Sequence, residues 1–317
     1  MATIRLIVTG DLEELALHES LRRVFGDSRH DGEEVIWDPP HKLHGATSRR
    51  LLTSERPPRP IRELVRVMLD EVLIGKHDSP ADLVLVIDDV ELDNIDQEVV
   101  IAGHFKSALE EALATRLKDR SLQVRERSRE RVRERCSFHL LRPMVESYFF
   151  GDIDALRSMG ARSTPLLRHI DVERSETDST SSASPERARL LPHVDVENFE
   201  TIDTDPGWLE ECRISNERQH RERPWWRHER HPKHYLEHLL NREGLLYDEK
   251  IHGESALQNL DWEHVPKADA DCAVVRCLFE DLADWFGVAN PLGPGDMQEC
   301  LYPLRSVDRS KLLLRNM

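Results

Sequence analysis

The sequence has few cysteines and no long apolar run. Five cysteines among 317 residues are too few for the disulfide framework of a small secreted domain, so we expect reduced thiols and a cytoplasmic protein. No stretch approaches the roughly 18 apolar residues of a membrane-spanning helix. Residues 1–6 also lack the basic start and apolar core of a signal peptide. The sequence therefore predicts neither a membrane span nor export.

Several catalytic and metal-binding motifs are also missing. There is no Gly-x-x-x-x-Gly-Lys loop to cradle phosphates and no Gly-x-Ser-x-Gly elbow, which argues against an intrinsic ATPase and a serine hydrolase. Four histidines recur at helical spacing, but no cysteine pair or His-Glu-x-x-His motif accompanies them. Surface histidines are therefore favoured over a zinc site. The four are His228, His231, His234 and His238.

Negative charge exceeds positive charge in this chain. Sixty acidic and 44 basic residues give a net charge of −16 with histidine neutral. Such a chain repels phosphate polyanions at long range, which excludes a histone-like nucleic-acid coat. A net negative charge does not exclude segments of the chain that are locally basic.

Strand-like and helix-like patterns alternate in the first half of the chain. Apolar runs predict strands, and apolar residues at helical spacing predict the helices between them. The run at 83–87 is continuously apolar, as expected of a strand buried on both faces. The order of elements indicates an α/β fold: an open, mostly parallel sheet with helices on both faces. The predicted strands are 4–8, 35–37, 83–87 and 137–141, and the predicted helices are 12–25, 61–72, 97–135 and 144–150.

Composition divides the chain into three parts. Residues 1–160 carry the α/β pattern, and residues 161–207 are acidic and rich in serine. The serine-rich part lacks the apolar surface needed to order itself, so we interpret it as a linker or insertion. Residues 208–317 show apolar stripes at helical spacing, which predict a mainly helical C-terminal region.

Acidic residues follow the predicted strands. In an open parallel sheet, ligands bind at the carboxyl ends of the strands. Carboxylates gathered there repel one another, and Mg²⁺ or Mn²⁺ relieves that repulsion through oxygen ligands. The alternative is that these acids cap and solvate helix N-termini. The residues in question are Glu13, Asp88, Asp89, Glu91 and Glu146.

These segments resemble Toprim-like domains. Residues 8–13, Val-Thr-Gly-Asp-Leu-Glu, are similar to the Val-Glu-Gly-x-Thr-Glu opening of such domains, and Asp88-Asp89-Val90-Glu91 lies where they carry an Asp-x-Asp motif. Residues 143–152 resemble the Glu-Ala-Trp-Leu-Leu-Ala-Asp block of a bacterial Toprim-like family of unknown function. Residues 231–236 and 247–250 are similar to that family's C-terminal part.

The resemblance implies Mg²⁺-dependent phosphodiester chemistry. Toprim domains occur in topoisomerases, primases and overcoming-lysogenization-defect nucleases, and the last group often works beside an ATPase in phage defence. On this basis we predict that Glu13, Asp88 and Asp89 are catalytic and that Asp88, Asp89, Glu91 and Glu146 bind metal. The sequence departs from the family at Thr9, which replaces the usual general acid/base Glu and cannot take that role near neutral pH. The alternative is a non-catalytic sensor or regulatory subunit that binds an ATPase or a toxin-like partner.

Two segments are locally basic. The first, residues 116–135, holds nine basic and four acidic residues. The second, residues 218–238, places arginines beside a Trp-Trp pair. Such surfaces bind nucleic-acid backbones or acidic partners. Ion pairs three residues apart and aromatic packing are the more common explanations of such segments. The residues proposed to bind nucleic acid or a partner are Arg127, Arg131, Arg223, Arg227 and Lys233.

Overall fold

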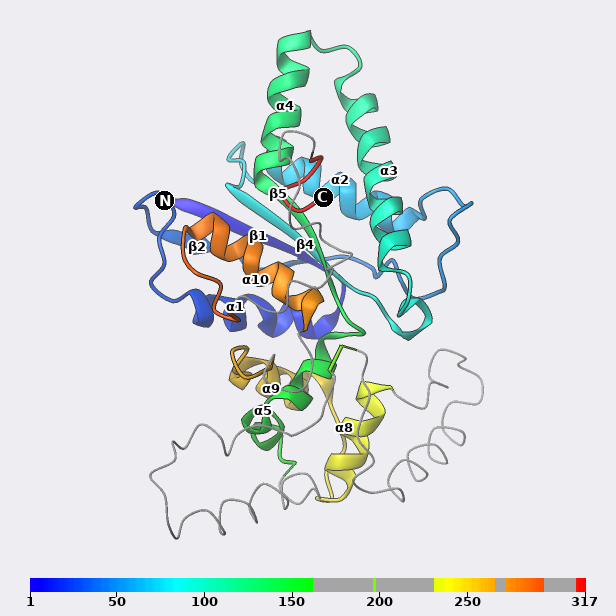
Figure 1. Cartoon of the computed structure of the whole chain (residues 1–317), viewed down its shortest axis with the longest axis vertical. Helices are drawn as coiled ribbons and strands as arrows, with labels where there is room; N and C mark the ends of the chain where they lie inside the picture. Colours follow the sequence, from blue (N-terminus) through cyan, green and yellow to red (C-terminus); the bar gives the residue numbers. More distant parts are fainter. Residues whose placement is uncertain (162–195, 198–230, 266–271, 294–311) are drawn as a thin grey trace. The chain divides into compact units, whose positions relative to one another are not determined.

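A computed structural model describes residues 1–161, 196–197, 231–265, 272–293 and 312–317 (Figure 1). The chain divides into two units: unit 1 is Met1–Leu141 with Ala273–Met317, and unit 2 is Arg142–Cys272. The α/β part therefore ends at 141 rather than at the predicted 160, and it takes in residues that the sequence assigned to the C-terminal region.

The sheet of unit 1 is parallel and confirms the predicted fold class. Its strand order is β2-β1-β4-β5, and β3 also pairs with β1. The first six residues of β4 are buried, which explains why its sequence is apolar without alternation. The strands are β1 (Ala2–Val8), β2 (Val35–Trp37), β3 (His41–Lys42), β4 (Leu83–Asp89) and β5 (Cys136–Leu141).

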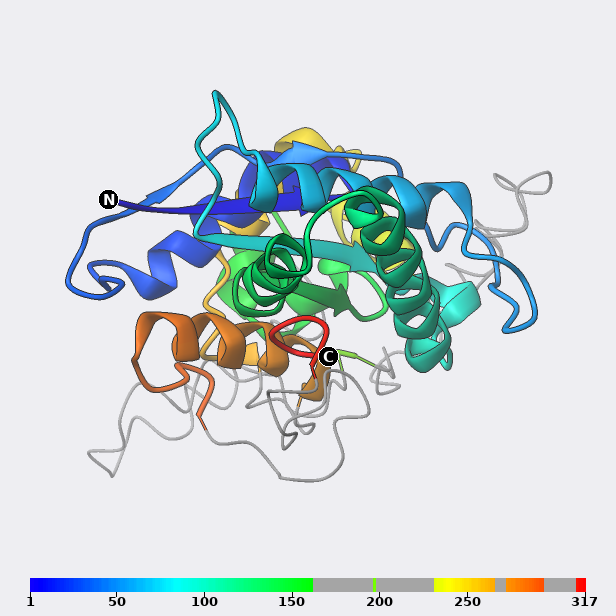
Figure 2. The same cartoon turned by 90° about the horizontal axis from the view of Figure 1, so that it is seen from above.

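Three helices cover one face of this sheet (Figures 1 and 2). They are α2 (Arg59–Leu73), α3 (Glu98–Leu117) and α4 (Leu122–Arg135). The sequence predicted a single helix over 97–135, but the chain turns before Ser121, whose side chain accepts the N–H of Val124 and so begins α4. Phe105 of α3 stacks on Phe138 of β5 with ring centroids 4.0 Å apart, which joins the helices to the sheet.

The opposite face is covered by a π-helical turn, η1 (Glu13–Leu17), by α1 (His18–Phe25) and by α10 (Ala273–Phe286). Phe25 stacks on Phe279 and Phe286 of α10, with ring centroids 5.9 and 5.1 Å apart. The apolar stripe that predicted α10 is therefore buried in unit 1. This packing is the physical reason that the predicted boundary at 208 does not separate the two units.

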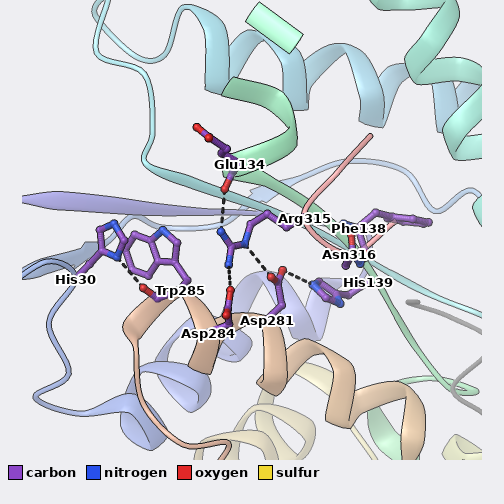
Figure 3. Close-up of polar contacts among 9 residues, drawn as sticks. All are labelled: His30, Glu134, Phe138, His139, Asp281, Asp284, Trp285, Arg315 and Asn316. Carbon is purple, nitrogen blue, oxygen red and sulfur yellow. Dashed lines mark hydrogen bonds and ion pairs between the residues drawn. The ribbon is translucent and has the colours of Figure 1, made fainter. Parts of the chain in front are cut away.

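The last described residues close the free edge of β5 (Figure 3). The Arg315 N–H donates to the Cys136 carbonyl at 2.9 Å, and the Asn316 side-chain amide pairs with both the N–H and the carbonyl of Phe138. A sheet edge left unpaired is a template for association with other chains. Here a segment distant in sequence supplies the missing partners.

A buried polar network lies beside this edge (Figure 3). The Arg315 guanidinium contacts Asp281 at 2.8 Å and Asp284 at 2.6 Å, both on α10. His139 Nε2 lies 3.2 Å from the other Asp281 oxygen. Burial alone would raise the pKa of Asp281, but the hydrogen bond with His139 and the charge of Arg315 hold it at about 2.

Unit 2 is helical where it is described, as the sequence predicted for the C-terminal region. His231 caps α8 and Pro232 occupies its first turn, the position where proline costs least. Trp262 is fully buried and packs against Tyr148, with ring centroids 5.5 Å apart. No described helix is long and apolar enough to cross a membrane. The elements are η3 (Val145–Gly151), α5 (Ile153–Ser158), α8 (Pro232–Asn241), η6 (Glu249–Gly253) and α9 (Glu254–Asn259).

Candidate functional site

The strand order has a topological switch point between β1 and β4. From β1 the chain moves outward to β2 on one side of the sheet and later returns to β4 on the other. Ligands of open α/β sheets bind at such a switch point, beyond the carboxyl ends of the strands. Val8 pairs in register with Ile87. Thr9, which follows β1, and Asp88, the next residue within β4, therefore lie next to each other.

Asp88 is the buried acid of this switch point. Its residue is 2% exposed. The Thr9 hydroxyl donates to Oδ1 at 2.6 Å, and the Ala46 N–H donates to Oδ2 at 3.3 Å. Desolvation outweighs these hydrogen bonds and raises the pKa of Asp88 to about 6. A carboxylate kept ionised at such a cost is typical of functional sites.

Glu13 approaches the same end of β1. It lies in the first turn of η1 and is 3% exposed. A Cβ atom at Gly10 would overlap the carboxyl group of Glu13, so glycine leaves the space that this carboxylate occupies. The sequence placed Gly10 in the motif of residues 8–13 without indicating this contact. In the fold it allows the carboxylate of Glu13 to lie against the residue that follows Thr9 at the end of β1.

The other acids of the predicted cluster are arranged differently. Asp89 follows Asp88 in β4, and successive strand residues point to opposite faces, so their side chains do not project to one side. Glu91 has a φ of 63° and precedes the short 3₁₀ helix η2 (Leu92–Asn94). Asp11 is ion-paired with Lys42 of β3. The sequence pattern could not distinguish these environments, because all three residues are acids at or just beyond the end of a strand.

Glu146 belongs to unit 2, where it is held by Lys233. The Lys233 ammonium lies 3.1 Å from Glu146 and 3.2 Å from Glu249. Desolvation raises the pKa of Glu146 and Lys233 offsets part of that rise, while the two carboxylates raise the pKa of Lys233 despite its burial. Lys233, predicted to contact nucleic acid or a partner, therefore has two intramolecular carboxylate partners.

The side chains at the switch point could supply only some of the ligands of a Mg²⁺ or Mn²⁺ ion. Within the described ranges, no group of three His, Cys, Asp or Glu residues is arranged to hold a metal. Mg²⁺ is, however, commonly bound through one or two carboxylates, with water and substrate phosphates as its other ligands. Asp88 is the residue of this site best placed to serve as such a ligand, with Asp89 following it on the strand.

The predicted basic surface is partly neutralised within the protein. In the segment around α4, Arg116 pairs with Asp70, Arg133 with Glu130 and Arg135 with Asp82. Arg127 is exposed and Arg131 half-buried. Neither has an ion-pair partner in the part of the chain that the structure describes, and their spacing of four residues places them on one side of α4. Arg223 and Arg227 lie outside the described residues.

Asn94 is a site residue that sequence reasoning missed. It is fully buried, and its side chain makes three hydrogen bonds to the backbone of residues 47–51. The Thr47 hydroxyl donates to the Asp89 carbonyl at 2.6 Å. No pattern around Asn94 distinguishes it from a surface turn residue, because its partners lie more than 40 residues away.

The raised pKa of Asp88 predicts a specific dependence of stability on pH. Between pH 3.8 and about 6 the folded protein retains a proton that the unfolded chain has released, so the free energy of unfolding falls as the pH rises through this range. The full effect is about 3 kcal/mol. Asp88→Asn removes it. Urea unfolding of wild type and variant across this range measures the difference, and identical pH profiles would contradict the assignment.

Comparison with family models, curated proteins and solved structures finds no match for this chain. The resemblance to Toprim-like domains therefore consists of the short motifs quoted above. The function proposed below therefore rests on the residues at the switch point between β1 and β4.

Proposed function

We propose that unit 1 is a divalent-metal-dependent nuclease of Toprim type that cleaves nucleic-acid phosphodiesters, as an effector working beside an ATPase in phage defence. The observation that carries the nuclease proposal is Asp88, a buried carboxylate with a pKa of about 6 at the switch point of a parallel sheet. The defence role and the ATPase partner rest on the motif resemblance.

The residues of the site have distinct tasks in this proposal. The Thr9 hydroxyl and the Ala46 N–H fix the orientation of the Asp88 carboxylate and favour its ionised form. Glu13, whose carboxylate lies against Gly10, takes the proton-transfer role that Thr9 lacks. A bound Mg²⁺ or Mn²⁺ supplies charge neutralisation and a more acidic water.

Substrate binding is assigned to the α4 surface in this proposal. Arg127 and Arg131 lie on one side of the helix, and other arginines of the segment are held by acids. A phosphate backbone supplies anionic partners for Arg127 and Arg131, for which the described residues of the protein provide no ion-pair partner. Since each phosphate contact releases counterions, binding through this surface weakens as salt increases.

The direct test is nicking of supercoiled plasmid in the presence of Mn²⁺. Wild type converts plasmid to the open circular form, and Asp88→Ala abolishes the conversion because the site loses its central carboxylate. Asp27→Ala, which removes an exposed acid after α1, serves as the matched control and retains wild-type activity. Equal nicking by wild type and Asp88→Ala would assign the cleavage to a contaminant.

A second candidate is a non-catalytic regulatory subunit that binds an ATPase or a toxin-like partner. The hydrogen bond from Thr9 to Asp88 favours it, since the hydroxyl satisfies an oxygen that a metal would otherwise take. Isothermal titration with millimolar Mn²⁺ separates the candidates. Absence of metal binding together with a stoichiometric co-purifying partner supports the regulatory subunit, whereas Mn²⁺ binding that Asp88→Ala abolishes supports the nuclease.

A further inference from the structure

Residues 44–51, here called the anchored loop, are fixed beside the switch point. The Asn94 side chain accepts the Leu51 N–H at 2.9 Å and donates to the carbonyls of Thr47 and Arg49 at 2.8 and 2.9 Å. The Thr47 hydroxyl and the Ala46 N–H add bonds to Asp89 and Asp88. All the residues that make these bonds to the loop lie on β4 or in the segment that follows it. The position of the loop is therefore fixed relative to Asp88.

The anchored loop presents positive charge to solvent. His44, Arg49 and Arg50 are exposed. Arg49 lies 3.6 Å from Glu55. Arg50 makes two bonds to Asp96, at 3.3 and 3.2 Å, and one to the Asp93 carbonyl at 3.1 Å. Its Nε and Nη2 also donate to the Gln97 side-chain oxygen at 2.7 and 2.6 Å.

These ion pairs are weak enough to be exchanged. The side chains of Arg49 and Glu55 are 69% and 40% exposed, and those of Arg50 and Asp96 are 55% and 65% exposed. Solvent screens such pairs, so they contribute little. A guanidinium binds phosphate through two parallel hydrogen bonds. A nucleic-acid phosphate therefore competes effectively with either carboxylate.

The length of the loop matches a short stretch of nucleic acid. Two residues lie between Ala46, which touches Asp88, and Arg49. The three Cα-to-Cα steps span at most about 11 Å, which corresponds to about three base-pair rises of roughly 3.4 Å along the axis of B-DNA. The arginines therefore lie within a few nucleotides of the acid.

We propose that the anchored loop is the substrate-backbone binding element of the switch point, with Arg49 and Arg50 contacting phosphates and Asn94 as the positioning residue. The proposal that these phosphates lie near a bond that is cleaved rests on the proposed nuclease function. Binding of nucleic acid to the anchored loop does not depend on that function. A nucleic-acid backbone is the occupant because the loop combines a fixed main chain with two adjacent, exchangeable guanidinium groups.

The first experiment measures binding without cleavage. Fluorescently labelled DNA duplex and single strand are titrated with wild type and Arg49→Gln/Arg50→Gln in EDTA at several salt concentrations. We expect the double variant to bind duplex about tenfold more weakly and its slope of log affinity against log salt to fall by about two. Arg62→Gln/Arg66→Gln removes two exposed charges from α2 and is the matched control.

The second experiment tests the anchor. Asn94→Ala removes three hydrogen bonds to the loop backbone, so limited trypsin digestion produces new fragments ending at Arg49 or Arg50, read by mass spectrometry. Asn94→Asp retains the acceptor for Leu51 but places a buried carboxylate oxygen against the carbonyls of Thr47 and Arg49, so it is expected to release the loop as well.

The outcomes separate this inference from the nuclease proposal. Failure of wild type to bind either DNA, or equal binding by the loop variant and its α2 control, overturns the anchored-loop assignment. Loss of binding by the loop variant alone supports it, even if wild type shows no nicking with Mn²⁺, which would contradict only the nuclease proposal.

Discussion

Arg315→Met is expected to lower the free energy of unfolding by about 3–5 kcal/mol. The side chain is 13% exposed and contacts Asp281 and Asp284, and Asp281 is itself 9% exposed (Figure 3). Methionine keeps much of the apolar stem but leaves Asp281 as a buried carboxylate without its cation. Removing one partner of a buried pair is costly for that reason.

The pH dependence identifies the cause. In wild type the pKa of Asp281 is about 2, below its ordinary value of 3.8, so its stabilisation is present above pH 3.8 and is lost as the pH falls towards 2. Without Arg315, ionised Asp281 stabilises the folded protein less. The free energies of unfolding of wild type and Arg315→Met therefore converge as the pH falls towards 2. Urea unfolding followed by circular dichroism measures this, with hydrogen exchange of β5 peptides assigning the loss to unit 1.

Arg66→Met is the matched control for Arg315→Met. Arg66 also contacts two carboxylates, Glu63 and Asp70, but it is 57% exposed. Its loss is expected to cost about 1 kcal/mol or less. Equal effects of the two substitutions would show that the burial of Asp281 does not decide the energy.

Gly75→Ala is expected to destabilise the protein by about 3 kcal/mol or more. Gly75 follows α2 with a φ of +74°, and a Cβ atom there would overlap the backbone of Ser79 and Pro80. The side chain therefore meets atoms that cannot rotate away. The segment between α2 and β4 has to move, and β4 lies at the centre of the sheet.

Gly32→Ala separates the two causes. Gly32 has a φ of +81°, but nothing lies within 4 Å of the position that an added Cβ atom would take. Only the conformational cost of about 1 kcal/mol applies there. Thermal and urea unfolding of both variants measure the difference, and similar losses would refute the steric explanation for Gly75.

Burial on both faces made the sheet predictable. A strand such as β4 has no polar alternation, so its sequence alone indicates where it lies. The extent of unit 1 was not predictable in the same way. The apolar stripe of α10 shows that the helix is buried, but an apolar stripe carries no information about which partner buries it.

The candidate site was predicted in part. Asp88 lies near the carboxyl end of β4 and Glu13 follows the end of β1, its neighbour in the sheet, and strand topology is accessible from local patterns. The pairing of Glu146 with Lys233 joins residues 87 positions apart, and that of Asn94 with the anchored loop depends on a buried polar side chain. Polar residues are usually exposed, so composition gives no indication that a polar side chain such as that of Asn94 is buried and makes several hydrogen bonds.

The closure of β5 by Arg315 and Asn316 also constrains biosynthesis. The 131 residues of unit 2, Arg142–Cys272, leave the ribosome after β5 and before α10. The edge that Asn316 covers therefore remains uncovered while all of unit 2 is translated. Unit 1 reaches its final form only after translation of its last segment, so slow elongation lengthens the period in which β5 is open to strand pairing with other nascent chains.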